Sequence, residues 1–264
     1  MTAAVAPAWP GPTPASGARQ VWLHAGRQTT RLLADRAAVF GLIFAPVLYF
    51  LGFYVPLQGA MRAQGLNYAQ YIGPALVAQS CIFIAMASAS AMAEDAKAGL
   101  LRRVASMPVS GWGPLLGRLL VDMACALVGA TTAVGIAALV GFRFTTVAGV
   151  LGFALVVAVF TAVLSVLFVA VALRAADPSA AAEALLVPQL LLLMLSTAFI
   201  PVDGFPAWLR PVVRWQPVSP VLESLRGLST GAPSALALLT TAGWCVVLGG
   251  LGAVLAVRAS RGAA

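Results

Sequence analysis

The sequence is poor in charge and in the residue types that carry acid–base and metal chemistry. Only 9% of its 264 residues are charged and 61% are hydrophobic, whereas soluble domains are roughly a quarter charged and half apolar. The chain has one histidine, His24, and one lysine, Lys97. These shortages argue against a soluble enzyme and indicate that a lipid bilayer is the solvent of most of the chain.

The same shortages exclude specific kinds of site. A nucleotide-binding P-loop ends in Gly-Lys followed by Ser or Thr, but Lys97 is followed by Ala98. Cysteine is also scarce, and Cys81, Cys125 and Cys245 lie in separate apolar runs without disulfide or zinc spacing. We therefore expect no nucleotide, metal ion or other cofactor on this chain.

Six charge-free apolar runs are the main feature that is present. Each is long enough to supply the roughly 20 helical residues that cross a hydrocarbon core. The runs are continuously apolar and rich in Ala and Leu, unlike barrel strands, which alternate in polarity. The predicted fold class is an all-α integral membrane protein whose six-span domain occupies residues 37–258. The runs cover residues 37–61, 63–93, 123–142, 144–173, 184–202 and 227–257.

The segments that flank the six-span domain differ in composition. Residues 1–18 are rich in Ala, Pro and Gly and uncharged, which predicts a disordered tail. Residues 19–36 mix arginines with apolar residues such as Trp22 and Leu33, which predicts an amphipathic helix at the membrane interface. That helix could serve as an anchor alone or also contact a partner. Residues 259–264 are predicted to be a short C-terminal tail.

The basic residues are divided unequally between the two sides of a six-span chain. Eleven fall on the side of the termini and five on the other side. The positive-inside rule then places both termini in the cytoplasm of a cell whose plasma membrane holds the chain. A basic cytoplasmic face on an anionic leaflet also accounts for the net charge of +8, so no nucleic-acid partner is needed.

One short motif resembles a catalytic site. Residues 227–231 read Gly-Leu-Ser-Thr-Gly and match the G-x-S-x-G pattern of hydrolase nucleophiles, which is meaningful only between a strand and a helix. His24 is predicted to lie on the opposite side of the membrane, and a serine without a base is a poor nucleophile. We expect Ser229 and Gly231 to mark the entry into a helix, and no catalytic residue.

The connection between the second and third runs, residues 93–122, is predicted to hold a short amphipathic helix. Ala96, Leu100 and Met107 share one face of a helical projection, and Pro108 ends the helix. An ordinary interfacial linker has the same composition.

The connection between the fifth and sixth runs, residues 201–233, is cut by five prolines into pieces too short to cross a membrane. It is nevertheless rich in aromatic and aliphatic residues, including Trp208 and Trp215. We expect an external re-entrant hairpin that dips into the outer leaflet and borders the transport pathway. An interfacial belt anchored by the two tryptophans is the alternative.

The order of these features resembles the permease subunits of type-2 ATP-binding-cassette exporters, especially the daunorubicin-resistance branch of drug and lipid exporters. In that family a glutamate ends span two, and a coupling helix with Gly, Arg and a Pro-x-Ser turn precedes a Gly-Arg pair. The residues that match this pattern are Glu94, Gly99, Arg102 or Arg103, Pro108 with Ser110, and Gly117-Arg118. A second match is the segment FPAWLRPVVRWQPVSP, residues 205–220, which resembles the external hairpin of the family.

The resemblance implies a non-catalytic permease that moves an amphipathic drug or lipid out of the cytoplasm or inner leaflet. It implies a separate cytoplasmic ATPase subunit that binds ATP and magnesium, and a second permease, identical or homologous. Residues implied in coupling to the ATPase are Glu94, Asp95, Gly99, Arg102, Arg103, Met107 and Pro108. Residues implied in an external gate are Phe205, Pro206, Trp208, Trp215 and Pro217.

Ionisable residues within the runs bear on the alternative, a solitary ion-coupled carrier. Such carriers need ionisable groups deep in the bundle or broken helices. Asp122 is the one candidate, and it stands four residues after Arg118, the spacing of a helical ion pair. We expect a structural Arg118–Asp122 ion pair rather than a proton relay.

Overall fold

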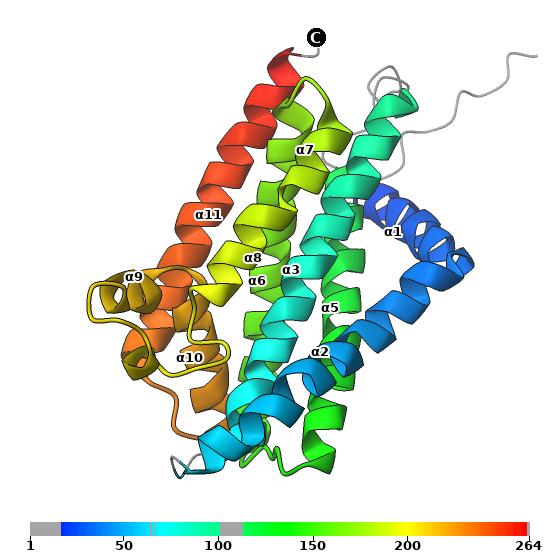
Figure 1. The fold of residues 1–264 in the computed structure, drawn as a ribbon. Helices are drawn as coiled ribbons and strands as arrows, with labels where there is room; N and C mark the ends of the chain where they lie inside the picture. The colour runs from blue at the N-terminus through cyan, green and yellow to red at the C-terminus, as the bar shows by residue number, and fades with distance from the viewer. Residues whose placement is uncertain (1–16, 64, 66, 101–112, 263–264) are drawn as a thin grey trace, which may run out of the picture.

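The computed structural model describes residues 17–63, 65, 67–100 and 113–262, and within these ranges the regular structure is entirely helical. Five described helices are long and apolar enough to cross a membrane. The prediction of an all-α multi-pass membrane protein is therefore confirmed. These five helices are α2 (Arg36–Ala63), α3 (Tyr68–Lys97), α5 (Gly113–Leu139), α6 (Val147–Arg174) and α11 (Ala235–Gly262) (Figure 1).

The count of six continuous spans is not confirmed, because the fifth predicted run does not form one long helix. Between residues 185 and 202 the α-helix covers only Leu186–Met194 (α8). This helix follows α7 (Pro178–Ala184) after a break at Leu185, and the two together, Pro178–Met194, are shorter than a membrane span. Pro188 has no N–H to donate to the Ala184 carbonyl, which accounts for the break. Figure 1 shows α8 ending part-way along the bundle.

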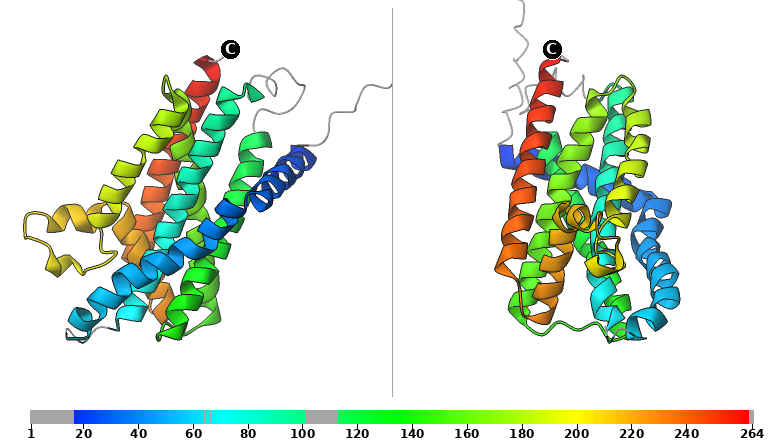
Figure 2. Two further views of the ribbon diagram at one scale, coloured as in Figure 1. Left: turned by 45° about the vertical axis from the view of Figure 1, so that its right-hand side comes forward. Right: turned by 60° about the vertical axis from the view of Figure 1, so that its left-hand side comes forward.

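Three short elements complete this passage from one end of the bundle to the other. They are η1 (Val202–Gly204), α9 (Arg210–Trp215) and α10 (Val218–Thr230). Figures 1 and 2 show α9 projecting sideways from the bundle, whereas α10 runs along it to the end opposite the C-terminus. Helix α10 packs against α3, α6 and α11.

Local sequence signals explain where the long helices begin and end. The side chains of Asn67 and Thr146 accept hydrogen bonds from backbone N–H groups in the first turns of α3 and α6. Gly231 has φ of 75° and ends α10, since this left-handed conformation suits glycine. Ser229 and Gly231 therefore stand at the exit of a helix, not at its entry as the sequence suggested.

Helix α3 is the centre of the bundle and packs against α2, α5, α6 and α10. Its small residues Ala85, Ala89 and Ala93 are fully buried, and they allow close helix packing where lipid provides no hydrophobic driving force. Helix α11 also packs closely on α6, because a Cβ atom on Gly252 would lie 3.0 Å from the Leu167 Cα. Helix α2 crosses this core obliquely (Figure 2).

Helix α1 (Gly17–Ala34) precedes the bundle and packs mainly against α5. It lies in the half of the molecule that also holds the C-terminus, the end of α3 and the turn before α7 (Figure 1). We call this end of the bundle the α1 end. Trp22, Leu23 and Leu33 on the outer face of α1 are exposed, while Ala25 is buried, the division expected of a helix that rests on a membrane surface.

Candidate functional site

The contact between α1 and α5 is made at Gly117, the glycine of the Gly-Arg pair. A Cβ atom on Gly117 would lie 2.8 Å from the Cβ of His24, 2.9 Å from the Val21 carbonyl oxygen and 3.0 Å from the Ala25 nitrogen. Two of these atoms belong to the α1 backbone and cannot move without displacing the helix. A glycine is thus required for α1 to rest on α5 at this distance.

Two ion pairs tie the end of α3 to neighbouring elements. Arg31 Nη1 of α1 lies 3.0 Å from Asp95 Oδ1, and Lys97 Nζ lies 3.2 Å from Asp177 Oδ1. Asp177 also accepts hydrogen bonds from the first N–H groups of α7. The Lys97 contact, helped by these N–H groups, lowers the pKa of Asp177. A displacement of α1 or of the α6–α7 turn would therefore also displace the end of α3.

The predicted coupling residues are only partly within the described ranges. Glu94 and Asp95 occupy the last turn of α3, and Gly99, with φ of 70°, follows its end. The Gly99 N–H donates to the Ala96 carbonyl, which closes the helix. The other predicted coupling residues, Arg102, Arg103, Met107 and Pro108, lie outside the described residues.

Arg118 and Asp122 do not form the direct ion pair expected from their spacing. Both are buried, and both contact the hydroxyl of Ser88 on α3: Arg118 Nε donates to Ser88 Oγ at 2.6 Å, and Ser88 Oγ donates to Asp122 Oδ2 at 2.6 Å. Among the described residues, the Arg118 Nη1 group is buried without a partner. Ser88 thus joins two opposite charges of α5 to α3, a link that sequence spacing does not reveal.

The residues predicted to form an external gate lie on and beside α9. Trp208 and Trp215 are exposed, Pro206 is exposed, and Phe205 and Pro217 are half-buried. The segment is folded on itself, since the Arg210 guanidinium donates to the carbonyls of Phe205 and Asp203 at 2.9 and 3.1 Å. It is also attached to α11, because the Trp244 indole N–H donates to the Trp215 carbonyl at 3.0 Å.

The sequence places Arg226 among the five basic residues opposite the termini and in a Leu225-Arg226-Gly227 match to the exporter family, but it does not reveal the contacts of this side chain. The Arg226 guanidinium donates to the Thr197 carbonyl at 2.6 Å and to the Tyr71 carbonyl at 3.1 Å. It also lies 3.6 Å from the centre of the Tyr71 ring, a cation–π distance. Arg226 therefore fastens α10 to α3 and to the turn that follows α8.

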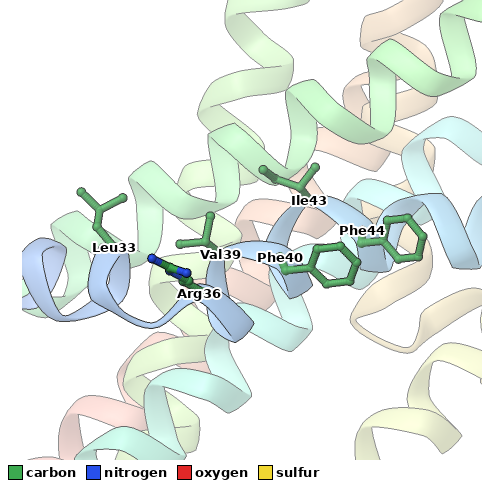
Figure 3. Close-up of a pocket in the computed structure, with 6 residues that line it drawn as sticks. All are labelled: Leu33, Arg36, Val39, Phe40, Ile43 and Phe44. Carbon is green, nitrogen blue, oxygen red and sulfur yellow. The ribbon is translucent and has the colours of Figure 1, made fainter.

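A shallow hollow marks the elbow between α1 and α2 (Figure 3). It has a volume of about 350 Å³, and its lining is apolar apart from the exposed Arg36. Phe40 and Phe44 stack along it with ring centres 4.7 Å apart. This surface is suited to lipid contact and offers no buried polar group to a ligand.

The family model described as ABC-2 type transporter matches residues 19–229. The chain belongs to this family. The matched range runs from α1 to the end of α10 and so contains the Gly117 contact, the Ser88 bridge, the α9 hairpin and Arg226.

Several known permeases are similar over most of their length. The doxorubicin resistance ABC transporter permease protein DrrB of Mycobacterium tuberculosis is 32% identical over 223 residues, which are 81% of this chain and 77% of that protein. The probable doxorubicin resistance permease DrrC of the same organism is 28% identical, over 86% and 84%. The daunorubicin resistance permease DrrB1 of Streptomyces coeruleorubidus is 26% identical, over 83% and 84%.

The resemblance to ABC exporter permeases inferred from the sequence is confirmed by these matches. Proteins of this kind are membrane subunits that work with a cytoplasmic ATPase, so the chain is a permease subunit of an ABC exporter. A solitary ion-coupled carrier is not favoured.

Proposed function

We propose that this permease moves an amphipathic drug or lipid out of the cytoplasm or the inner leaflet. The observation that carries the proposal is the family match over residues 19–229 together with relatives named for doxorubicin and daunorubicin resistance. Apolar helices with few charges suit a substrate with a large apolar body better than an ion or a sugar. The chain itself catalyses nothing, and ATP and magnesium bind to the partner subunit.

The ATPase subunit docks on the α1 end of the bundle, which faces the cytoplasm with both termini. The ion pairs Arg31–Asp95 and Lys97–Asp177 support this placement, because they connect the elements on which an ATPase movement would act. Glu94, Asp95 and Gly99 then belong to the coupling surface, with Arg102 and Arg103. ATP can shift the bundle only if this interface differs between the two states.

The external hairpin acts as a gate at the opposite leaflet. Trp208 and Trp215 are exposed on the single chain. Their side chains therefore contact either lipid or a second permease, identical or homologous. The hydrogen bonds of Arg210 hold the hairpin as one unit. A gate of this kind moves as a body and not residue by residue.

The test is purification of the chain with its ATPase from the native membrane. We expect the wild-type complex to hydrolyse ATP, and the double change Arg102→Glu with Arg103→Glu to weaken ATPase attachment or uncouple hydrolysis from export, because charge reversal opposes an acidic partner. Arg143→Glu at the opposite end is the matched control. Unchanged attachment and unchanged transport per ATP in the double variant would refute the coupling surface.

A further inference from the structure

A cavity of about 720 Å³ lies between α1, α2, α3 and α5 of the single chain. On α3 its lining follows helical spacing from Leu76 and Gln79 through Ser88 to Glu94. Gln79 and Glu94 are thus separated by roughly 22 Å along the helix axis. The cavity extends from the α1 end deep into the bundle, and it is distinct from the shallow elbow hollow of Figure 3 on the outer face of α2.

Buried polar groups without partners line this cavity. Gln79 is 3% exposed, and neither its amide oxygen nor its amide nitrogen has a hydrogen-bond partner among the described residues. The buried Nη1 of Arg118 is likewise unpartnered. Pro46 also lines the cavity and has no N–H, so the Leu42 carbonyl lacks its usual helical donor. Groups of this kind cost free energy unless something bonds to them. The Gln79 amide nitrogen and Arg118 Nη1 are donors and call for acceptor oxygens on a ligand, whereas the Gln79 amide oxygen and the Leu42 carbonyl are acceptors and call for a hydroxyl group.

The charges around the cavity favour a cation. Its lining carries two guanidinium groups against four carboxylates, a formal excess of two negative charges on a chain whose net charge is +8. Glu94 at the α1 end forms no ion pair within the described part of the chain. The charged lining residues are Arg31, Arg118, Asp35, Glu94, Asp95 and Asp122.

Much of the remaining wall is apolar, with Tyr49 on α2 and Phe83 and Ile84 on α3. The other polar side chains in the lining are Gln28, Ser80 and Ser90. We propose that the cavity binds a hydrophobic cation that carries carbonyl, ether or hydroxyl oxygens, within one permease subunit. The apolar body lies against α2, the oxygens accept hydrogen bonds from Gln79 and Arg118, and the cationic group lies toward Glu94. This inference deepens the proposed function, on which it rests for the link between binding and export.

Tetramethylrhodamine methyl ester, a fluorescent cation with a carbonyl oxygen, is a suitable probe. We expect saturable binding to the purified full chain in nanodiscs, measured by fluorescence anisotropy against empty nanodiscs. Tetramethylrhodamine with a free carboxylate has the same rings but no net positive charge, and it should bind several-fold more weakly. Equal binding of the two dyes, or no saturable binding of the ester, would overturn the proposal.

Matched variants locate the site. Gln79→Leu should weaken ester binding roughly tenfold, and Glu94→Gln about threefold, as hydrogen bonds and a partly solvated charge are lost. Gln189→Leu removes an equally buried and unpartnered amide outside the cavity, and Glu183→Gln removes an exposed carboxylate outside it. Neither control should change binding.

Thermal stability, dye binding and export can be measured separately for each variant. Loss of an unpartnered buried amide does not destabilise a fold, so Gln79→Leu should keep its thermal stability. Wild-type affinity in both Gln79→Leu and Glu94→Gln would refute the site. If the assembled transporter exports the ester while these variants bind normally, the proposed function stands without the site. If the variants lose binding but the assembled transporter exports neither dye, the site stands without the proposed function.

Discussion

Replacement of Gly117 by Ala tests whether α1 is seated on α5 through a close backbone contact. The added methyl group would meet backbone atoms of Val21 and Ala25 at 2.9 and 3.0 Å and the His24 Cβ at 2.8 Å. Backbone cannot yield as a flexible side chain can, so α1 must move outward. Overpacking of this kind costs about 1 to 3 kcal/mol.

Gly135→Ala is the matched control, because it lies on the same helix and a Cβ atom there meets nothing within 4 Å. Both substitutions gain the same helix propensity, so their difference isolates the α1 contact. For a chain of this size the overpacking corresponds to a fall in Tm of roughly 2 to 10 °C.

The assay is thermal unfolding of the purified chain followed with a thiol-reactive dye. Cys81 is 1% exposed in the native bundle and becomes reactive on unfolding. Gly117→Ala should unfold at a lower temperature than wild type, whereas Gly135→Ala should not. In the assembled transporter, Gly117→Ala should also reduce export per ATP hydrolysed. Equal melting temperatures for the two variants would refute the close α1–α5 contact.

Three further predictions concern single side chains. Burial, and to a smaller extent the charge of Arg27, lower the pKa of His24 below 6.5. Wild type should therefore lose stability as the pH falls below 6.5, whereas His24→Gln should not. Parallel curves of stability against pH for the two proteins would contradict this prediction. The pKa of Asp177 is lowered from 3.8, chiefly by Lys97. Wild type should therefore be more stable than Asp177→Asn at neutral pH, and this stability difference should vanish in acid as the folded-state carboxylate is protonated. A stability difference that grows in acid would contradict the prediction. Arg226→Gln should lower the free energy of unfolding by about 1.5 to 3 kcal/mol, because charged hydrogen bonds are lost. Arg210→Gln is the control, and equal free energies of unfolding for the two variants would show that Arg226 does not fasten α10 to α3.

Helices with long apolar runs were predictable from the sequence because their burial in lipid depends on local composition. The run at residues 144–173 corresponds to α6 (Val147–Arg174), and the run at 37–61 to α2 (Arg36–Ala63). The fifth run misled the prediction because it is continuously hydrophobic. Pro188 signals only the break at Leu185 between α7 and α8, since a proline inside a helix removes one backbone donor. The run fails as a span because α8 already ends at Met194.

The long-range polar contacts could not be predicted from spacing. Arg118 and Asp122 are one helical turn apart, yet Ser88 from another helix bridges them. Arg226 belongs to a short family match and to the basic residues opposite the termini, but neither signal predicts that it bonds to Thr197 and stacks on Tyr71. Such contacts depend on which helix faces which, and that arrangement is set by packing of the whole bundle. The Gly-Arg resemblance did select Gly117, but the close contact that requires this glycine emerged only with α1 in place.

As a permease subunit of an ABC exporter, this chain should transport its substrate only when another subunit hydrolyses ATP. The most direct measurement is uptake of tetramethylrhodamine methyl ester into inside-out proteoliposomes that contain the chain with its ATPase, the chain alone, or the ATPase alone. We predict ATP-dependent uptake only when both are present, and none on an imposed proton or sodium gradient. Gradient-driven uptake by the chain alone, or ATP turnover by the isolated chain, would show that it is not a permease driven by a separate ATPase.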